Sequence, residues 1–413
     1  MNADPDHPPS GALGSGPVAT WLLRDAHDLA DTRSVIGELC QRLLATGFPL
    51  SRLFLSIRTL HPQVATIGYR WRRGESLPSE TPREHGIDSE EVYLRSPIKL
   101  IHDGASELRR RLADLATPRE FPILDELAAE GATDYLIVPL RFSSQRVNAI
   151  SIATDRPGGF SNAELARFKD LTPLLALVLE IKETQRLAST LLDTYLGHDA
   201  GRRVLGGLVR RGDGITLAAA LWYCDLRGFT ATTEPLPRDQ IIALLNDYFA
   251  CMVGAVHRHG GEVLKFIGDA MLAIFPIADD LDRDRACLVA LVAAEDALAD
   301  LDNLNERRRA EGKAVLEADI ALHSGAVTYG NIGAPDRLDF TAIGTAVNLV
   351  TRLERMSEEL GQRLLASARF ASPCGSKLVS VGHYRLRGFS QPQEIFALPP
   401  RVAKRRETAR AAL

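Results

Sequence analysis

The sequence predicts an α+β protein built from two folding units. Its 413 residues are enough for two or three domains. From Ile215 onward, patterns typical of strands and helices follow in the order strand, helix, hairpin, helix, strand, hairpin and helix. The first half has strand pairs of its own, followed by a helix. We therefore expect one domain over residues 19–185, a helical connector over 186–214 and a second domain over 215–397.

The composition narrows the class of protein. A hydrophobic content of 45% and a charged content of 25% are ordinary for a soluble globular protein. The net charge of −4 gives no general reason to expect a nucleic-acid partner. The five cysteines are scattered and form no C-x-x-C pair, so neither a disulfide framework nor a zinc site is indicated. With no signal peptide and no long apolar run, we expect a cytoplasmic protein without a membrane partner.

The first half begins with a Pro-, Gly- and Ser-rich segment, residues 1–18, for which we expect disorder. Apolar residues at helical spacing then predict a helix from Ala19 to Ala45. The elements expected next are strands at Leu53–Ile57 and Val64–Trp71, a polar loop from Arg72 to Pro97 and a helix from Glu107 to Leu115.

A clearer pattern closes this half. Two apolar runs, 134–140 and 147–153, predict a hairpin, and Ser161 and Glu164 form a capping box that starts a helix. The strand Ile137-Val-Pro-Leu140, the strand from Asn148 to Ala153 and Phe160-Ser-x-x-Glu-Leu165 resemble a GAF-type sensory domain. The resemblance implies an α/β regulatory domain with an unknown small-molecule effector. A dimerisation or spacer domain without a ligand fits the same pattern.

The second half is organised around two aspartates in glycine-containing turns. Asp225 follows a buried strand from Ile215 to Tyr223, and Asp269 follows Val263-Leu264. Two such turns on neighbouring strands would place two carboxylates side by side, which is unfavourable unless a cation lies between them. Oxygen ligands suit Mg²⁺ or Mn²⁺. For either aspartate alone, a simple turn-capping role is the more common explanation.

The sequence after Asp269 also predicts a series of helices and strands. The predicted elements are helices at 238–257 and 284–309, a strand from Glu317 to Ser324, its return over Gly325–Gly333, a strand over Asp339–Gly344, and a helix beginning near Thr345. The last helix carries Asn348 and Arg352 four residues apart, hence on one face.

Five motifs in this half resemble the class III nucleotide cyclases, the adenylate and guanylate cyclases. They are Asp-Leu-Arg-Gly-Phe-Thr at 225–230, Lys-Phe-Ile-Gly-Asp at 265–269, His-Ser-Gly-Ala-Val at 323–327, Gly-Asn-Ile-Gly at 330–333 and Thr-Ala-Ile-Gly-Thr-Ala-Val-Asn-Leu-Val-Thr-Arg-Leu-Glu at 341–354. The resemblance implies a dimeric, ferredoxin-like βαββαβ catalytic domain. It also implies attack of the ribose 3′-hydroxyl on the α-phosphate of ATP, which forms 3′,5′-cyclic AMP and pyrophosphate.

The resemblance assigns roles to nine positions. Asp225, Asp269 and the Leu226 carbonyl would hold two Mg²⁺ or Mn²⁺ ions per site. Asn348 would orient the ribose, and Arg352 would meet charge on the α-phosphate. The remaining positions, which would contact the substrate, are Lys265, Thr341, Phe229 and Thr230.

Base selectivity depends on Lys265 and its partner Thr341. A lysine donates hydrogen bonds and cannot accept them, so it suits N1 of adenine rather than the protonated N1 of guanine. Thr341 can accept from the adenine amine, but its hydroxyl can also donate. We therefore expect an adenylate cyclase. A guanylate cyclase and a nucleotide-binding signalling scaffold without turnover remain alternatives, as does cyclic nucleotide binding by the first half.

In the family that this half resembles, the metal aspartates and the base-reading pair of one protomer face the Asn and Arg of the other. Because the chain has one cyclase module, the resemblance implies a homodimer with two equivalent sites at the interface. Residues 335–339 are expected at the dimer contact. The chain ends in a basic tail, residues 398–413, for which a solvated end is the simplest interpretation.

Overall fold

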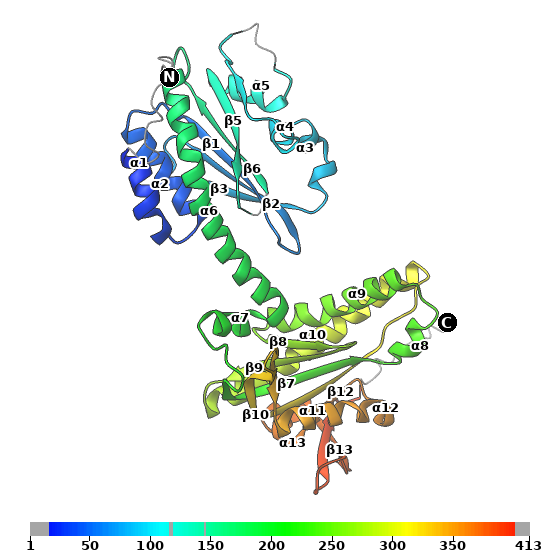
Figure 1. Cartoon of the computed structure of the whole chain (residues 1–413). Helices are drawn as coiled ribbons and strands as arrows, with labels where there is room; N and C mark the ends of the chain where they lie inside the picture. Colours follow the sequence, from blue (N-terminus) through cyan, green and yellow to red (C-terminus); the bar gives the residue numbers. More distant parts are fainter. Residues whose placement is uncertain (1–15, 115–118, 144–145, 401–413) are drawn as a thin grey trace, which may run out of the picture. The chain divides into compact units, whose positions relative to one another are not determined.

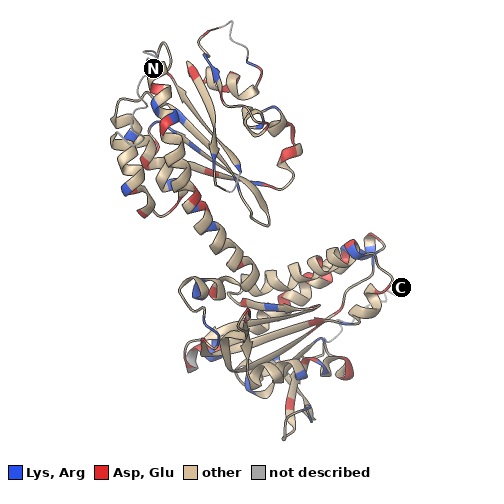
Figure 2. Ribbon diagram, in the orientation of Figure 1, with Lys and Arg blue, Asp and Glu red and all other residues tan. Residues whose placement is uncertain are grey.

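The computed structural model describes residues 16–114, 119–143 and 146–400, which form two compact units, Met1–Leu191 and Leu192–Leu413 (Figure 1). The expected disordered segment lies outside the described residues except for its last three positions. The expected basic tail lies outside them from residue 401 onward. Each unit has a sheet of its own, and most strand residues are uncharged (Figure 2).

The first unit is a six-stranded sheet in the order β3-β2-β1-β6-β5-β4, with every neighbouring pair antiparallel. The strands are β1 (Arg52–Arg58), β2 (Val64–Arg72), β3 (Ser79–Glu84), β4 (Leu108–Arg110), β5 (Asp134–Arg141) and β6 (Val147–Thr154). One face packs against α1 (Pro17–Arg24), α2 (Thr32–Ala45) and α6 (Asn162–Leu196). The other packs against α4 (Pro97–His102) and α5 (Pro122–Ala129), with α3 (Glu91–Leu94) beside α4 (Figure 1).

Three expectations for this unit are wrong. The single helix from Ala19 to Ala45 is divided, because the Asp31 side chain accepts a hydrogen bond from Ser34 N and so begins α2 afresh. The expected loop from Arg72 to Pro97 contains β3, a polar strand that pairs through its backbone with β2. The expected helix from Glu107 to Leu115 contains instead the short strand β4, paired with β5.

The capping box at the start of α6 is confirmed. Ser161 N donates to the Glu164 carboxylate at 2.7 Å, and Glu164 N donates to Ser161 Oγ at 3.2 Å. The helix accommodates Pro173 in its interior and continues to Leu196.

The second unit is an eight-stranded sheet. Its central strands follow the order β10-β7-β9-β8, all antiparallel, which is the 4-1-3-2 order of the expected βαββαβ unit. Its strands are β7 (Gly214–Leu226), β8 (Glu262–Ile267), β9 (Ala270–Ile277), β10 (Ala318–Ala334), β11 (Arg337–Ile343), β12 (Leu364–Ser367), β13 (Val379–Tyr384) and β14 (Gln393–Ala397). Its main helices are α7 (His198–Leu205), α8 (Phe229–Thr233), α9 (Arg238–Arg258), α10 (Asp280–Ala310), α11 (Thr345–Glu354) and α12 (Met356–Leu360), and the short α13 (Ala368–Ala371) follows β12.

The expected return over Gly325–Gly333 is wrong, since β10 runs without a turn from Ala318 to Ala334 and pairs with β7 as far as Gly330. The glycines here serve close packing. A Cβ on Gly330 would lie 2.2 Å from the Asp213 carbonyl oxygen, and one on Gly325 would lie 2.8 Å from the Ala346 side chain.

Both faces of this sheet are covered by helices. The alternating side chains of β7 divide between them: Trp222 and Cys224 face α9 and α10, whereas Leu221 and Tyr223 face α11. Within the described residues, α9 is the one helix long and apolar enough to cross a membrane. Its residues Leu244, Tyr248, Met252, Ala255 and Val256 are buried in the core of this unit.

Candidate functional site

Two aspartates meet where three central strands of the second unit end. Asp225 is the penultimate residue of β7, and its place in the alternation directs it to the α11 face of the sheet. Asp269 lies in the two-residue turn between β8 and β9, where Gly268 takes a φ of +66° that a side chain would disfavour. Since Cys224 of β7 pairs with Met271 of β9, the register brings the two carboxyl groups together as expected.

The electrostatics of this pair favour a cation. Burial, followed by repulsion from Asp269, raises the pKa of Asp225 from 3.8 to about 7, and the hydrogen bond from Leu226 N at 3.0 Å offsets this only in part. Within the described residues, no group of three His, Cys, Asp or Glu side chains is arranged to hold a metal. Two carboxylates with backbone and substrate oxygens fit Mg²⁺, which commonly uses one or two protein carboxylates plus phosphates.

Two further acids surround the pair. Asp319 of β10 lies directly opposite Asp225 in the register and is neutralised by Arg227, whose Nε donates to Asp319 Oδ2 at 3.0 Å. Glu354, at the end of α11, has no such ion pair within the part of the chain that the structure describes; burial and the nearby Asp225 and Asp319 raise its pKa to about 7. Sequence analysis assigned no role to Arg227, Asp319 or Glu354, although Arg227 and Glu354 lie inside the quoted motifs.

Lys265 and Thr341 are brought together as expected. The Lys265 ammonium, on β8, donates to Thr341 Oγ1 at 2.9 Å and to Asp339 Oδ2 at 2.8 Å, both on β11. Asp339, which the sequence suggested only for a dimer contact, is thus part of this polar cluster. An ammonium group has three donors, so one remains for another acceptor.

Asn348 and Arg352 lie on the same side of α11, as expected from their spacing. At about 100° per residue they are separated by only about 40° around the helix axis, whereas Glu354 lies roughly 120–160° from both. The carboxyl group of Glu354 is close enough to Asp225 and Asp269 for their negative charges to raise its pKa. Asn348 and Arg352 therefore lie on a different side of α11 from Glu354; Asn348 is exposed and Arg352 is half-buried.

The two remaining candidates differ in exposure. Phe229, the first residue of α8, packs against the hydrophobic core that α9 and α10 share with the sheet. Thr230 is exposed. The structure thus gives Phe229 a packing role and leaves Thr230 available to a ligand.

Comparison with known proteins agrees with this site. Residues 216–398 match the family described as the adenylate and guanylate cyclase catalytic domain. The chain is 30% identical over 178 residues to adenylate cyclase 1 of Rhizobium meliloti, covering 42% of this chain and 26% of that protein. It is 34% identical over 154 residues to an adenylate cyclase of Anabaena cylindrica, covering 36% and 29% respectively.

Among solved structures, the adenylyl cyclase CyaB of P. aeruginosa is similar with 28% identity and a TM-score of 0.42, over 45% of this chain and 95% of that one. The chain spans under a third of the length of the two adenylate cyclases named above. The family match and these relatives support an adenylate/guanylate cyclase catalytic domain in the second unit.

Proposed function

We propose that the protein is an adenylate cyclase that converts ATP to 3′,5′-cyclic AMP and pyrophosphate. The observation that carries the proposal is the conjunction of the Asp225–Asp269 pair with the Lys265–Thr341 hydrogen bond in a domain of the cyclase family. The aspartate pair suits the triphosphate with its cations, and the lysine–threonine pair suits the base.

In this proposal the phosphate end is held by Asp225, Asp269 and the Leu226 carbonyl with two Mg²⁺ or Mn²⁺ ions per site. When bound, these ions neutralise phosphate charge and help to activate the 3′-hydroxyl. Arg352 donates to the α-phosphate oxygens, where negative charge develops, and Asn348 orients the ribose. Thr230, which is exposed and lies five residues after Asp225, is a further substrate contact, while Phe229 supports its helix from the core.

Lys265 supports adenine over guanine. Two of its three donors are used by Asp339 and Thr341, which leaves the third to donate to N1 of an adenine base. Thr341 Oγ1 accepts from Lys265 and keeps a second lone pair for the adenine amine. Lys265→Glu should therefore lower ATP turnover far more than dimerisation, and equal losses of both would identify Lys265 as a structural residue.

The site is shared between two protomers of a homodimer. The supporting observation is that Asn348 and Arg352 lie on a different side of α11 from Glu354, which is close to the acid pair, so a second copy's carboxylates are proposed to complete the site. Mixing Asp225→Ala with Arg352→Ala protein should restore about a quarter of wild-type activity, because random pairing makes half the dimers mixed and each has one intact site. No recovery after proven subunit exchange would contradict a shared site.

The first unit is proposed as a GAF-like regulatory domain with a small-molecule effector, acting in the cytoplasm without a nucleic-acid or membrane partner. Its supporting observation is α6, a continuous helix that begins on the first sheet and ends at Leu196 in the second unit. For the first unit, the competing explanation is a spacer domain without a ligand. For the whole chain, the competing explanations are a guanylate cyclase and a nucleotide-binding scaffold that is not an enzyme.

The deciding experiment supplies the purified chain with Mn²⁺ or Mg²⁺ and either ATP or GTP, and separates the products by chromatography. Cyclic AMP from ATP, with little cyclic GMP from GTP, is the expected result. Cyclic GMP as the main product would contradict the assignment of Lys265. No cyclic product with either nucleotide, from the whole chain or from residues 214–413, would favour the scaffold.

A further inference from the structure

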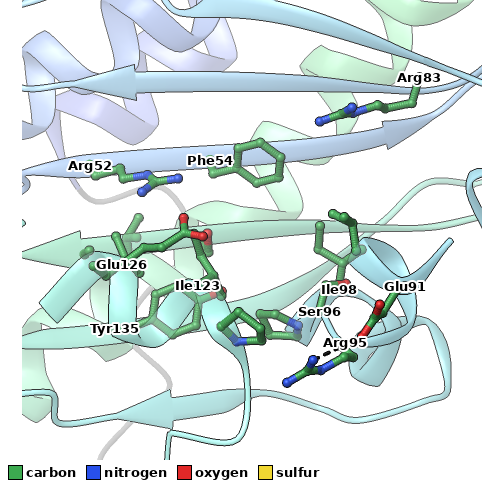
Figure 3. Close-up of a pocket in the computed structure, with 17 residues that line it drawn as sticks. Arg52, Phe54, Arg83, Glu91, Arg95, Ser96, Ile98, Ile123, Glu126 and Tyr135 are labelled. Atoms are coloured by element: carbon green, nitrogen blue, oxygen red, sulfur yellow. Dashed lines mark hydrogen bonds and ion pairs between the residues drawn. The ribbon is translucent and has the colours of Figure 1, made fainter. Parts of the chain in front are cut away.

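The first unit contains a cavity of about 530 Å³ between its sheet and helices α4 and α5 (Figure 3). Its walls are mostly apolar and include Phe54 of β1, Tyr135 of β5, Ile98 of α4 and Ile123 of α5. A second hollow of about 240 Å³ shares Phe54, Ile98 and four other residues with it, so the two are continuous. This combined space is within the size range of small-molecule sites.

The charge of this space is uneven. Alternation along the strands places Arg52, Arg70 and Arg83, from β1, β2 and β3, on the sheet face that carries Phe54. The Phe54 ring lies against Gly68, where an added Cβ would be 3.1 Å from it. All residues that line the smaller hollow belong to the described part of the chain, and none of them is acidic.

The three arginines are not equally compensated. Arg52 lies 3.6 Å from Glu130, which also pairs with Arg72 at 2.5 Å. Among the described residues, no carboxylate forms an ion pair with Arg70 or Arg83. These two arginines lie on adjacent strands, four positions apart in the register. Both side chains are exposed, so water solvates them in the free protein and their guanidinium groups are available to an anion.

Each end of the cavity carries one glutamate. Glu126 lies at the end where Arg52 and Tyr135 are found, and Glu91 lies at the end of Ile98, where it pairs with Arg95 at 3.1 Å (Figure 3). Arg83, which lies on the Ile98 side of the cavity, has no such acid partner among the described residues. His102, which lines the smaller hollow, has no partner for its Nε2 within the described residues, while its Nδ1 lies 3.0 Å from the Tyr93 hydroxyl. A neutral imidazole that accepts at Nδ1 carries its proton at Nε2, which is one more donor.

We propose that this cavity binds a small organic anion. An aromatic or apolar body fills the larger hollow against Tyr135 and Ile123, and one acidic group, a carboxylate or a phosphate, is bound by Arg70 and Arg83. Guanidinium groups suit both acids because they donate two parallel hydrogen bonds to either. The proposal concerns binding alone, so it stands whether or not the second unit has cyclase activity.

The test uses two probes with nearly the same apolar body on the whole chain. Anilinonaphthalene sulfonate carries an acidic group, whereas phenylnaphthylamine lacks it, and both fluoresce on entering an apolar site. The wild type should bind the sulfonate saturably at one site per chain. The double variant Arg70→Gln/Arg83→Gln should weaken the sulfonate about tenfold, as expected for loss of charge-assisted hydrogen bonds, and leave phenylnaphthylamine unchanged.

Two further variants complete the design. Ile123→Trp, at a partly exposed position of the cavity wall, should weaken both probes by filling the space. Arg167→Gln, at an exposed position of α6 outside the cavity, should weaken neither. Equal sulfonate affinity in the wild type and the double arginine variant, or no saturable binding by the wild type, would overturn the proposal. Displacement by naphthoate as against naphthyl phosphate distinguishes a carboxylate ligand from a phosphate ligand.

Discussion

The two units each place an aspartate at the end of a sheet strand, and the two aspartates have opposite environments. Asp134 of β5 is fully buried, and it accepts hydrogen bonds from Arg109 Nη2 at 2.7 Å and from Phe160 N at 3.0 Å. Asp225 of β7 is only partly buried, and its nearest charged neighbour is another carboxylate. A buried acid with paired donors holds a fold together, whereas an acid facing a second acid makes the fold less stable unless a cation is bound. The difference separates a structural carboxylate from a candidate catalytic one.

The largest effect should follow removal of one carboxylate of the acid pair. Asp225→Asn should lower cyclic AMP formation about a thousandfold, because the charge stabilisation of several kcal/mol contributed by a held cation is lost. Its melting temperature without metal should not fall, since the change removes like-charge repulsion. Product analysis and thermal unfolding of the same preparation measure both quantities. A variant that loses activity and melting temperature together would mean that Asp225 stabilises the fold.

The matching change in the first unit should affect stability instead. Asp134→Ala leaves the Arg109 guanidinium without its acid, and breaking a buried pair costs about 3–5 kcal/mol of unfolding free energy. Urea denaturation measures the loss, and hydrogen exchange over β5 and β6 locates it. Asp155→Ala, which breaks an exposed pair with Arg73, is the control and should cost less than about 1 kcal/mol. Equal losses of unfolding free energy in the two variants would mean that Asp134 stabilises the fold no more than an exposed carboxylate does.

The same contrast explains what sequence could predict. Asp225, Asp269, Lys265 and Thr341 were predicted because each lies in a short motif whose chemistry is local. Glu354 also lies inside a motif, but its role depends on where the end of α11 meets β7, which no spacing along the chain gives. Asp319 faces Asp225 only through the pairing of β7 with β10.

Elements were missed for related reasons. The strands β3 and β4 have little apolar alternation and form through pairing with a neighbour, so their own sequences carry a weak signal. The return expected over Gly325–Gly333 is absent, and glycine is an ambiguous signal there because it marks both turns and close backbone contacts. The distinction appears only once Gly330 is seen against Asp213.

Metal binding should produce a smaller effect that depends on the acid pair alone. Mn²⁺ at a hundred times its dissociation constant should stabilise the wild-type fold by about 2.7 kcal/mol, and this stabilisation should be absent in Asp225→Asn and Asp269→Asn. Thermal unfolding with and without Mn²⁺, and no nucleotide, measures it. Asp155→Asn is the control and should keep the full shift. A shift that survives both site variants would locate the metal elsewhere.

The two units should also differ in their response to pH. Asp225 has a folded pKa of about 7 against an ordinary value of 3.8, so the folded protein holds a proton that the unfolded chain releases. Its contribution to stability is therefore greatest at low pH and is lost as the pH rises from about 4 to about 7. Glu164 has its pKa lowered to about 2 by Arg156, so its contribution is present above pH 4.5 and is lost as the pH falls toward 2.

Melting curves in a chelating buffer over this range separate the two groups. As the pH rises from 4 to 7, the wild type should lose stability relative to Asp225→Asn. As the pH falls below 4.5, the wild type should lose its advantage over Glu164→Gln. Parallel curves for wild type and Asp225→Asn would mean that Asp225 is ionised in the folded protein without metal. Glu164 and Asp225 would then differ in the groups that surround them but not in their charge state at neutral pH.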